Sequence, residues 1–225
     1  MGGATMVREQ LVHDLKQLPL HQGSLVMVHS SLASIGPVEG GAATVVDALL
    51  AAIGDGGTLV VPTFTFPVSG RFGFVFDPDE TPSYMGAISE EARCRPGAQR
   101  SIHLHHSVAA IGPLAAELVI SGGASAWDAD SPMGQLFANN GFFVLLGVPY
   151  LRLTAMHLCE IDVGVPYRRA RYDEGCLRRS DGHEEPLMSI SLPPPSSGWK
   201  GNDFNYLGQM MENDLIGRAF LLVTV

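Results

Sequence analysis

Short apolar runs alternate with longer amphipathic stretches along most of this 225-residue chain. The runs are five to seven residues long and are bounded by turn-forming residues. Continuous apolar runs of this length predict β-strands that are covered on both faces of a sheet. The predicted strands are residues 25–29, 58–62, 107–111 and 142–148, with two more at 187–192 and 219–225.

Helices are predicted between these strands. Residues 6–18 are amphipathic, and the apolar stretch 42–53 ends before Gly54, a residue type common just after a helix. Thr81 and Ser131 each precede a proline, the order expected of a capping side chain followed by the first helical residue. Further helices are predicted at residues 113–120 and 132–140, and from a cap at Asp203 to about residue 211.

The order of these elements predicts the fold class. Strand and helix patterns alternate from residue 25 to about residue 162, which is typical of an α/β fold with a mostly parallel central sheet flanked by helices. Residues 164–225 mix short strands with loops and predict a β-rich C-terminal part packed onto the same sheet. No segment resembles a linker, so we expect a single domain over residues 1–225.

The charge balance excludes some classes of partner. The chain carries 23 acidic and 14 basic side chains, a net charge of −9. Binding to nucleic acid or to an anionic membrane needs a basic face, so neither is expected, whereas a cationic small molecule would be attracted. Five basic residues lie close together, and we expect a solvated strand edge there, with phosphate binding as the alternative: Arg168, Arg169, Arg171, Arg178 and Arg179.

The three cysteines indicate a reducing compartment. Cys94, Cys159 and Cys176 are widely spaced and form no CxxC pair, so neither a disulfide framework nor a zinc ribbon is expected. The first 18 residues lack the apolar core of a signal peptide, and no apolar run is long enough to span a membrane. We therefore expect a cytoplasmic protein without a targeting segment.

Two segments beside predicted strands carry candidate chemistry. Residues 29–41 (HSSLASIGPVEGG) link a strand to a helix and expose backbone N–H groups that suit phosphate or amide oxygens, although a plain turn has the same composition. Residues 100–107 (RSIHLHHS) contain His103, His105 and His106. This cluster raises the hypothesis of a zinc hydrolase. The alternative is that these histidines are structural or line a substrate site.

The segment TAMHLCE, residues 154–160, is a candidate acid–base site. If Thr154 caps a helix, His157 and Glu160 lie three residues apart on one face of it. The positive end of the helix dipole favours a neutral imidazole, the form that accepts a proton, and a neighbouring carboxylate can fix its tautomer. The alternative is an ordinary solvated His–Glu pair.

Taken together, these segments resemble the aminoglycoside N(3)-acetyltransferase family of antibiotic N-acetyltransferases. The resemblance rests on residues 28–66, 100–118 and 131–160, and its order and spacing extend over residues 11–167. The family segment H[ST]SL matches residues 29–32, and its TxLHxxE segment matches residues 154–160. This chain departs from the family where members often have His-Pro, because Leu104 follows His103.

The resemblance implies transfer of an acetyl group from acetyl-CoA to an amine of a polycationic aminoglycoside, by a monomer or homodimer and without a metal. It implies a general base at His157, supported by Glu160 and Thr154. The acetyl-CoA site would include His29, Ser30, Ser31, Leu32, Thr63, Phe64 and Ser107. The aminoglycoside would contact Glu160, Asp162, Asp128 and His103.

Three other hypotheses stay open from the sequence. The acceptor can be another small amine, since cleft carboxylates cannot be located from the sequence alone. The chain can be a zinc hydrolase that uses the histidine cluster. It can also bind CoA without turnover, because its C-terminal part is shorter than the family pattern, which continues past the last strand with a further helix.

Overall fold

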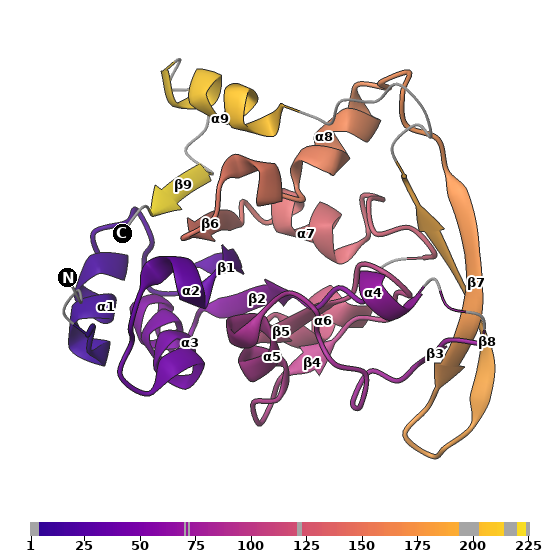
Figure 1. Cartoon of the computed structure of the whole chain (residues 1–225), viewed down its shortest axis with the longest axis horizontal. Helices are drawn as coiled ribbons and strands as arrows, with labels where there is room; N and C mark the ends of the chain where they lie inside the picture. The colour runs from indigo at the N-terminus through magenta and orange to yellow at the C-terminus, as the bar shows by residue number, and fades with distance from the viewer. Residues whose placement is uncertain are drawn as a thin grey trace.

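The computed structural model describes residues 5–69, 71, 73–120, 123–193, 203–213 and 220–223. Six strands form the main sheet in the order β4-β5-β2-β1-β6-β9 (Figure 1). The strands β1, β2, β6 and β9 are parallel, whereas β5 runs antiparallel to both β2 and β4. The bounds are β1 Leu25–Ser30, β2 Thr58–Pro62, β4 Gln99–Arg100, β5 Val108–Ile111, β6 Phe142–Leu146 and β9 Phe220–Val223. The predicted α/β class with a mostly parallel sheet is confirmed.

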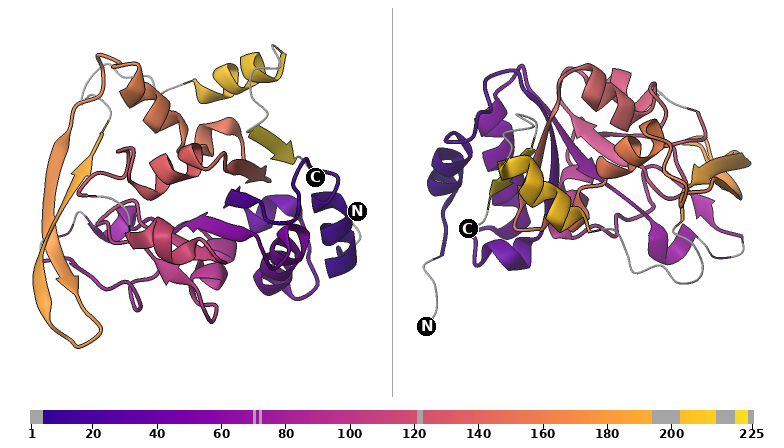
Figure 2. Two further views of the ribbon diagram at one scale, coloured as in Figure 1. Left: turned by 180° about the vertical axis from the view of Figure 1, so that it is seen from behind. Right: turned by 90° about the horizontal axis from the view of Figure 1, so that it is seen from above.

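Helices cover both faces of this sheet (Figure 2). The side chains of β1 alternate, so Val26 and Val28 pack on one helical layer while Leu25 and Met27 pack on the other. The first layer consists of α1 Arg8–Leu15, α3 Gly41–Ile53 and α5 Ala87–Arg93. The second consists of α6 Ala115–Ile120, α7 Pro132–Ala138, α8 Met156–Asp162 and α9 Phe204–Asn213. Shorter turns are α2 Leu32–Ile35, α4 Phe66–Ser69 and the 3₁₀ turn η1 Tyr150–Arg152.

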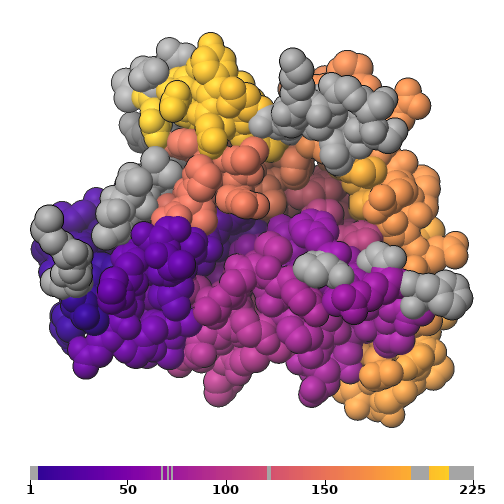
Figure 3. All heavy atoms as spheres, viewed as in Figure 1, coloured from indigo at the N-terminus to yellow at the C-terminus, as the bar shows by residue number. Residues whose placement is uncertain are grey.

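The β-rich C-terminal part is confirmed, but most of it does not join the main sheet. The hairpin β7 Arg171–Arg178 and β8 Glu184–Ser191 pairs with β3 Val75–Phe76 to form a second sheet of three strands. Its small core consists of Phe76, Leu104 and Leu177. In the space-filling view this hairpin lies along one edge of the molecule, and α9 lies at the top (Figure 3).

Two of the predicted helix caps, Ser131 and Asp203, are confirmed. The Ser131 side chain accepts the Gly134 N–H over 3.1 Å, and the Asp203 carboxylate accepts the Tyr206 N–H over 3.0 Å. The helix predicted to begin at Thr81 and Pro82 is wrong, because α5 begins only at Ala87. The Thr81 side chain instead accepts the N–H of Asp77 within a loop. Among the described helices, none is long and apolar enough to cross a membrane.

Candidate active site

His29 and Thr154 meet at the carboxyl edge of the main sheet. Because β1 and β6 are adjacent and parallel, the segments that follow them leave from the same edge. The Thr154 N–H donates to His29 Nε2 over 3.1 Å, and Thr154 Oγ1 lies 2.8 Å from the same nitrogen. This contact fastens the connection between β6 and α8 to the end of β1.

Burial keeps the His29 imidazole neutral, because desolvation lowers its pKa to about 4. Since Nε2 accepts the Thr154 N–H, the ring proton lies on Nδ1. The Nδ1 atom is enclosed and has no hydrogen-bond partner among the described residues. His29 therefore organises this edge of the sheet and is not placed to exchange protons with a ligand.

His157 and Glu160 form a close pair on α8, on one helical face as their spacing predicts. Glu160 Oε2 lies 2.6 Å from His157 Nδ1. The carboxylate oxygen accepts, so the ring proton lies on Nδ1 and the lone pair of Nε2 stays available. The helix begins one residue later than expected, with Ala155 as its cap residue, and the His157 N–H donates to the Thr154 carbonyl over 3.0 Å.

Arg168 belongs to this site and not to a solvated strand edge, which corrects the expectation for that residue. Its side chain is only 9% exposed and donates from Nε to Glu160 Oε2 over 3.0 Å. A second bond from Nη1 reaches the Leu192 carbonyl over 2.9 Å. Nη2 lies 3.2 Å from His157 Nδ1, so a fixed positive charge faces the imidazole. The sequence offered only a weak signal, an arginine eight residues after the candidate glutamate.

The surroundings favour a neutral imidazole beside an ionised carboxylate. Burial and the charge of Arg168 lower the pKa of His157, while Glu160 acts in the opposite direction. Burial alone raises the pKa of Glu160, yet the hydrogen bonds from His157, Tyr167 and Arg168 outweigh it and lower that pKa. The pair is therefore set to accept a proton near neutral pH.

Two aromatic side chains contact the His157 imidazole, and neither follows from a sequence motif. The Trp127 ring lies 5.3 Å from it, edge to face, and the Phe204 ring lies 5.4 Å from it. Both aromatic side chains are buried in the core beneath α7, α8 and α9. Phe204 brings α9 against the His157 ring from a segment 47 positions later in the chain, the difference between residue numbers 204 and 157.

A groove in two connected parts adjoins the site and shares Ser30, Ser31 and Met85 between them. The inner part has a volume of about 510 Å³ and reaches His29 and Thr154. The outer part, about 790 Å³, extends past Leu32 to the turn before α3. Of the residues predicted to bind the acyl donor, these line the groove: His29, Ser30, Ser31, Leu32 and Phe64.

Thr63 and Ser107 are placed differently from the prediction that they bind the cofactor. Both are fully buried, and their hydroxyl oxygens lie 3.0 Å apart. Arg100 donates from Nε toward both hydroxyls, over 3.1 Å to Thr63 and 3.2 Å to Ser107. Their hydroxyls therefore hold the partly buried guanidinium of Arg100 and do not face the groove.

The residues predicted to bind the acceptor differ in exposure and in their contacts. Asp128 and Asp162 are exposed, as a cation-binding carboxylate needs to be. The carboxylate of Glu160 is instead engaged by His157 and Arg168. His103 is buried and lines a small cavity together with His106 and Trp127, and its contact with the acceptor stays a prediction.

The histidine cluster serves the packing of this region. Nδ1 of His103 accepts the backbone N–H groups of His105 and His106, each over 3.0 Å. The ring of His105 contacts Ser69 Oγ at 2.6 Å and Asp173 Oδ2 at 3.0 Å. Within the described residues, no group of three or more His, Cys, Asp or Glu side chains is arranged to hold a metal ion. Two of the three proposed zinc ligands, His103 and His105, are thus held by other contacts, whereas Nδ1 of His106 has no hydrogen-bond partner among the described residues.

The fold and the site together define an α/β protein that combines an acid–base pair with a long groove at the carboxyl edge of its sheet, a combination suited to chemistry on a bound small molecule. Residues 27–219 match the aminoglycoside 3-N-acetyltransferase family, and the chain belongs to that family.

Individual relatives agree with this assignment. The chain is 34% identical over 189 residues to aminoglycoside N(3)-acetyltransferase IX of Micromonospora chalcea, in a match that covers 75% of this chain and 66% of that relative. It therefore spans slightly less than two thirds of that curated relative. The crystal structure of aminoglycoside acetyltransferase AAC(3)-Xa superposes with a TM-score of 0.82 at 28% identity, over 96% of this chain and 84% of that one. The structure of AAC-VIa bound to sisomicin superposes with a TM-score of 0.80 at 27% sequence identity, over 92% of this chain and 85% of that one.

Proposed function

We propose that this chain transfers the acetyl group of acetyl-CoA to the 3-amino group of aminoglycosides and so confers resistance to these antibiotics. One observation carries the proposal: His157 has its Nδ1 held by Glu160 at 2.6 Å, which keeps Nε2 available as a base. Family membership and the sisomicin bound by a relative with 27% identity support the substrate class.

His157 acts as the general base in this proposal. Amines of aminoglycosides are mostly protonated at neutral pH, so the attacking amine must lose a proton. Nε2 of His157 accepts it, while Glu160 holds Nδ1–H and stabilises the imidazolium that results. A positioned base of this kind typically contributes about 10²–10⁴-fold to the rate.

The groove suits an elongated acyl donor. Acetyl-CoA, when bound, supplies the acetyl group as a thioester. The connected groove parts and the short polar turn at Ser30 and Ser31 fit a long, thin ligand. The Ser31 N–H is committed to the Leu146 carbonyl, whereas the Leu32 N–H lies at the first position of α2, where no intrahelical acceptor exists. Leu32 is therefore our candidate to donate toward the thioester oxygen.

The acceptor would enter from the exposed side of the imidazole. The His157 side chain is 27% exposed. The exposed Asp128 directly follows Trp127, whose ring contacts the imidazole, and the exposed Asp162 ends the helix that carries His157. We propose that these two carboxylates, and not Glu160, receive the cationic sugar. We also propose that the protein works in the cytoplasm, because Cys94, Cys159 and Cys176 are free thiols.

One assay tests the proposal. The protein is incubated with acetyl-CoA and a panel of aminoglycosides, and release of free thiol is followed. Thiol release only with acceptors that bear a free 3-amino group, together with an acetylated product of the matching mass, is the expected result. Thiol release with other small amines but not with aminoglycosides would show that the acceptor is a different amine. No thiol release with any acceptor would contradict the proposal.

A further inference from the structure

Part of the groove wall is a loop without regular structure. Residues 77–86 join β3 to α5, and Tyr84 and Met85 face the groove from its end. Within the described parts of the chain, one backbone bond ties this end to the main sheet region, from the Tyr84 N–H to the Phe64 carbonyl over 3.0 Å. The position of the wall therefore depends on side chains that hold the loop.

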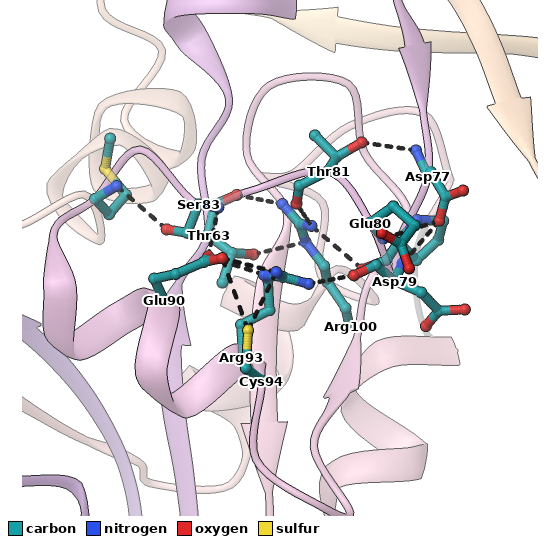
Figure 4. Close-up of polar contacts among 12 residues, drawn as sticks. Thr63, Asp77, Asp79, Glu80, Thr81, Ser83, Glu90, Arg93, Cys94 and Arg100 are labelled. Carbon is teal, nitrogen blue, oxygen red and sulfur yellow. Dashed lines mark hydrogen bonds and ion pairs between the residues drawn. The ribbon is translucent and has the colours of Figure 1, made fainter. Parts of the chain in front are cut away.

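Arg100 holds the first half of the loop from below (Figure 4). Its guanidinium donates to the carbonyls of Pro78 and Thr81, and also to the Thr63 carbonyl over 2.8 Å. The same group lies 4.9 Å from the centre of the Phe76 ring. Among the described residues, this cation donates only to neutral hydroxyl and carbonyl oxygens. Burial lowers its pKa to about 10, so it stays charged at neutral pH.

Glu90 and Arg93 of α5 hold the loop at two further points, Ser83 and Asp79 (Figure 4). Glu90 Oε2 accepts the Ser83 N–H over 2.7 Å and Arg93 Nε over 2.9 Å. Arg93 Nη1 donates to the Asp79 carbonyl in turn. Both contacts act on backbone groups of the loop, and Ser83 directly precedes Tyr84 and Met85, which line the groove.

We propose that Arg100 and the Glu90–Arg93 pair are positioning residues that fix the Tyr84–Met85 wall and so set the affinity of the groove for the acyl donor. This inference rests on the proposed function, since it takes acetyl-CoA as the ligand. It also gives Thr63 and Ser107 an indirect role: they hold Arg100, and Arg100 holds the wall.

Glu90 offers the sharpest test because its neighbour is a matched control. Glu91 lies on the same helix and pairs with Arg95 at 2.9 Å, and the two glutamate side chains are 33% and 35% exposed. Only Glu90 contacts the loop. Binding of acetyl-CoA is measured by calorimetry for the wild type, Glu90→Ala, Glu91→Ala and Glu90→Gln, with kcat, KM and melting temperature for each.

We expect Glu90→Ala to raise Kd and KM for acetyl-CoA about tenfold, the scale of one charge-assisted hydrogen bond, with kcat within about twofold of the wild type. Glu91→Ala should bind normally at a similar melting temperature. Glu90→Gln should recover most of the affinity, because its amide oxygen can still accept the Ser83 N–H.

Three results would overturn the inference: normal binding by Glu90→Ala, an equal loss in Glu91→Ala, or a loss confined to kcat. Each of these leaves the proposed function intact. Failure of the wild type to bind acetyl-CoA would instead contradict the proposed function itself.

Discussion

Arg168 and Glu160 act on His157 in opposite electrostatic senses. Glu160 stabilises the protonated ring and Arg168 opposes it, so together with burial they leave the imidazole neutral and oriented. A base needs both properties: a free lone pair before the reaction and a partner for the charge afterwards.

The first prediction concerns Arg168→Met. Only neutral His157 accepts a proton, so kcat/KM should fall as the pH drops through the lowered pKa of this imidazole. Removing the cation removes one cause of that lowering, so the acid limb should move to higher pH. The pH dependence of kcat/KM and proton NMR titration of the His157 ring measure it. The exposed Arg169→Met is the control, and an unmoved acid limb in Arg168→Met would count against this electrostatic role.

The pair His157–Glu160 could be predicted from spacing alone, because three residues on a helix place both side chains on one face. Arg168 could not, because its contact depends on how the chain turns after α8. Its neighbours in the sequence are exposed arginines, and a local pattern cannot distinguish a buried cation from a solvated one. Phe204 lies still further away, on α9.

At the scale of elements, α9 completes the enclosure of the site. Its Asn205 side chain accepts the Leu151 N–H over 2.9 Å, and the Tyr150 hydroxyl donates to Glu212 over 2.8 Å. Gly208 lets the helix approach η1 closely, since a Cβ there would lie 2.2 Å from the Tyr150 ring. The docking of α9 brings Phe204 onto His157.

The second prediction is that Gly208→Ala destabilises the protein. Helix propensity alone favours alanine over glycine by about 1 kcal/mol, but overpacking against Tyr150 typically costs about 1–3 kcal/mol. The melting temperature should therefore fall, and kcat with it as Phe204 is displaced. A rise in melting temperature would show that α9 does not pack on η1 as the structure has it.

Helices and strands could be predicted where the local pattern of apolar residues determines them. The apolar runs at β1, β2 and β6 predict strands because both faces are covered. The direction of β5 was not predictable, since antiparallel pairing with β2 is a long-range property. The false helix start at Thr81 has a similar cause: Arg100 takes the loop carbonyls, and no local signal reports that contact.

At the scale of the whole molecule, the net charge of −9 suits a polycationic acceptor and opposes an anionic acyl donor. The groove is lined by uncharged residues such as Ser30, Ser31 and Phe64 and by one cation, Arg152, with no carboxylate among its described lining residues, which suits the proposed anionic donor. The net negative charge is therefore expected to attract the cationic acceptor rather than the acyl donor.

The third prediction follows from this difference. Raising the ionic strength from about 0.01 M to about 0.15 M shortens the Debye length from about 30 Å to about 8 Å. The kcat/KM for a polycationic aminoglycoside should fall several-fold, whereas that for acetyl-CoA should not fall. Steady-state kinetics at the two salt concentrations measure both constants, and equal salt effects on the two substrates would contradict steering of the acceptor.

The most direct test of the account is the comparison of the wild type with His157→Ala. The account predicts that the variant loses at least about 10²-fold in kcat for aminoglycoside acetylation. Its Kd for acetyl-CoA should stay within about twofold, because the groove does not depend on this side chain. A near-normal kcat in His157→Ala, with the protein folded and acetyl-CoA bound, would contradict the assignment of His157 as the base.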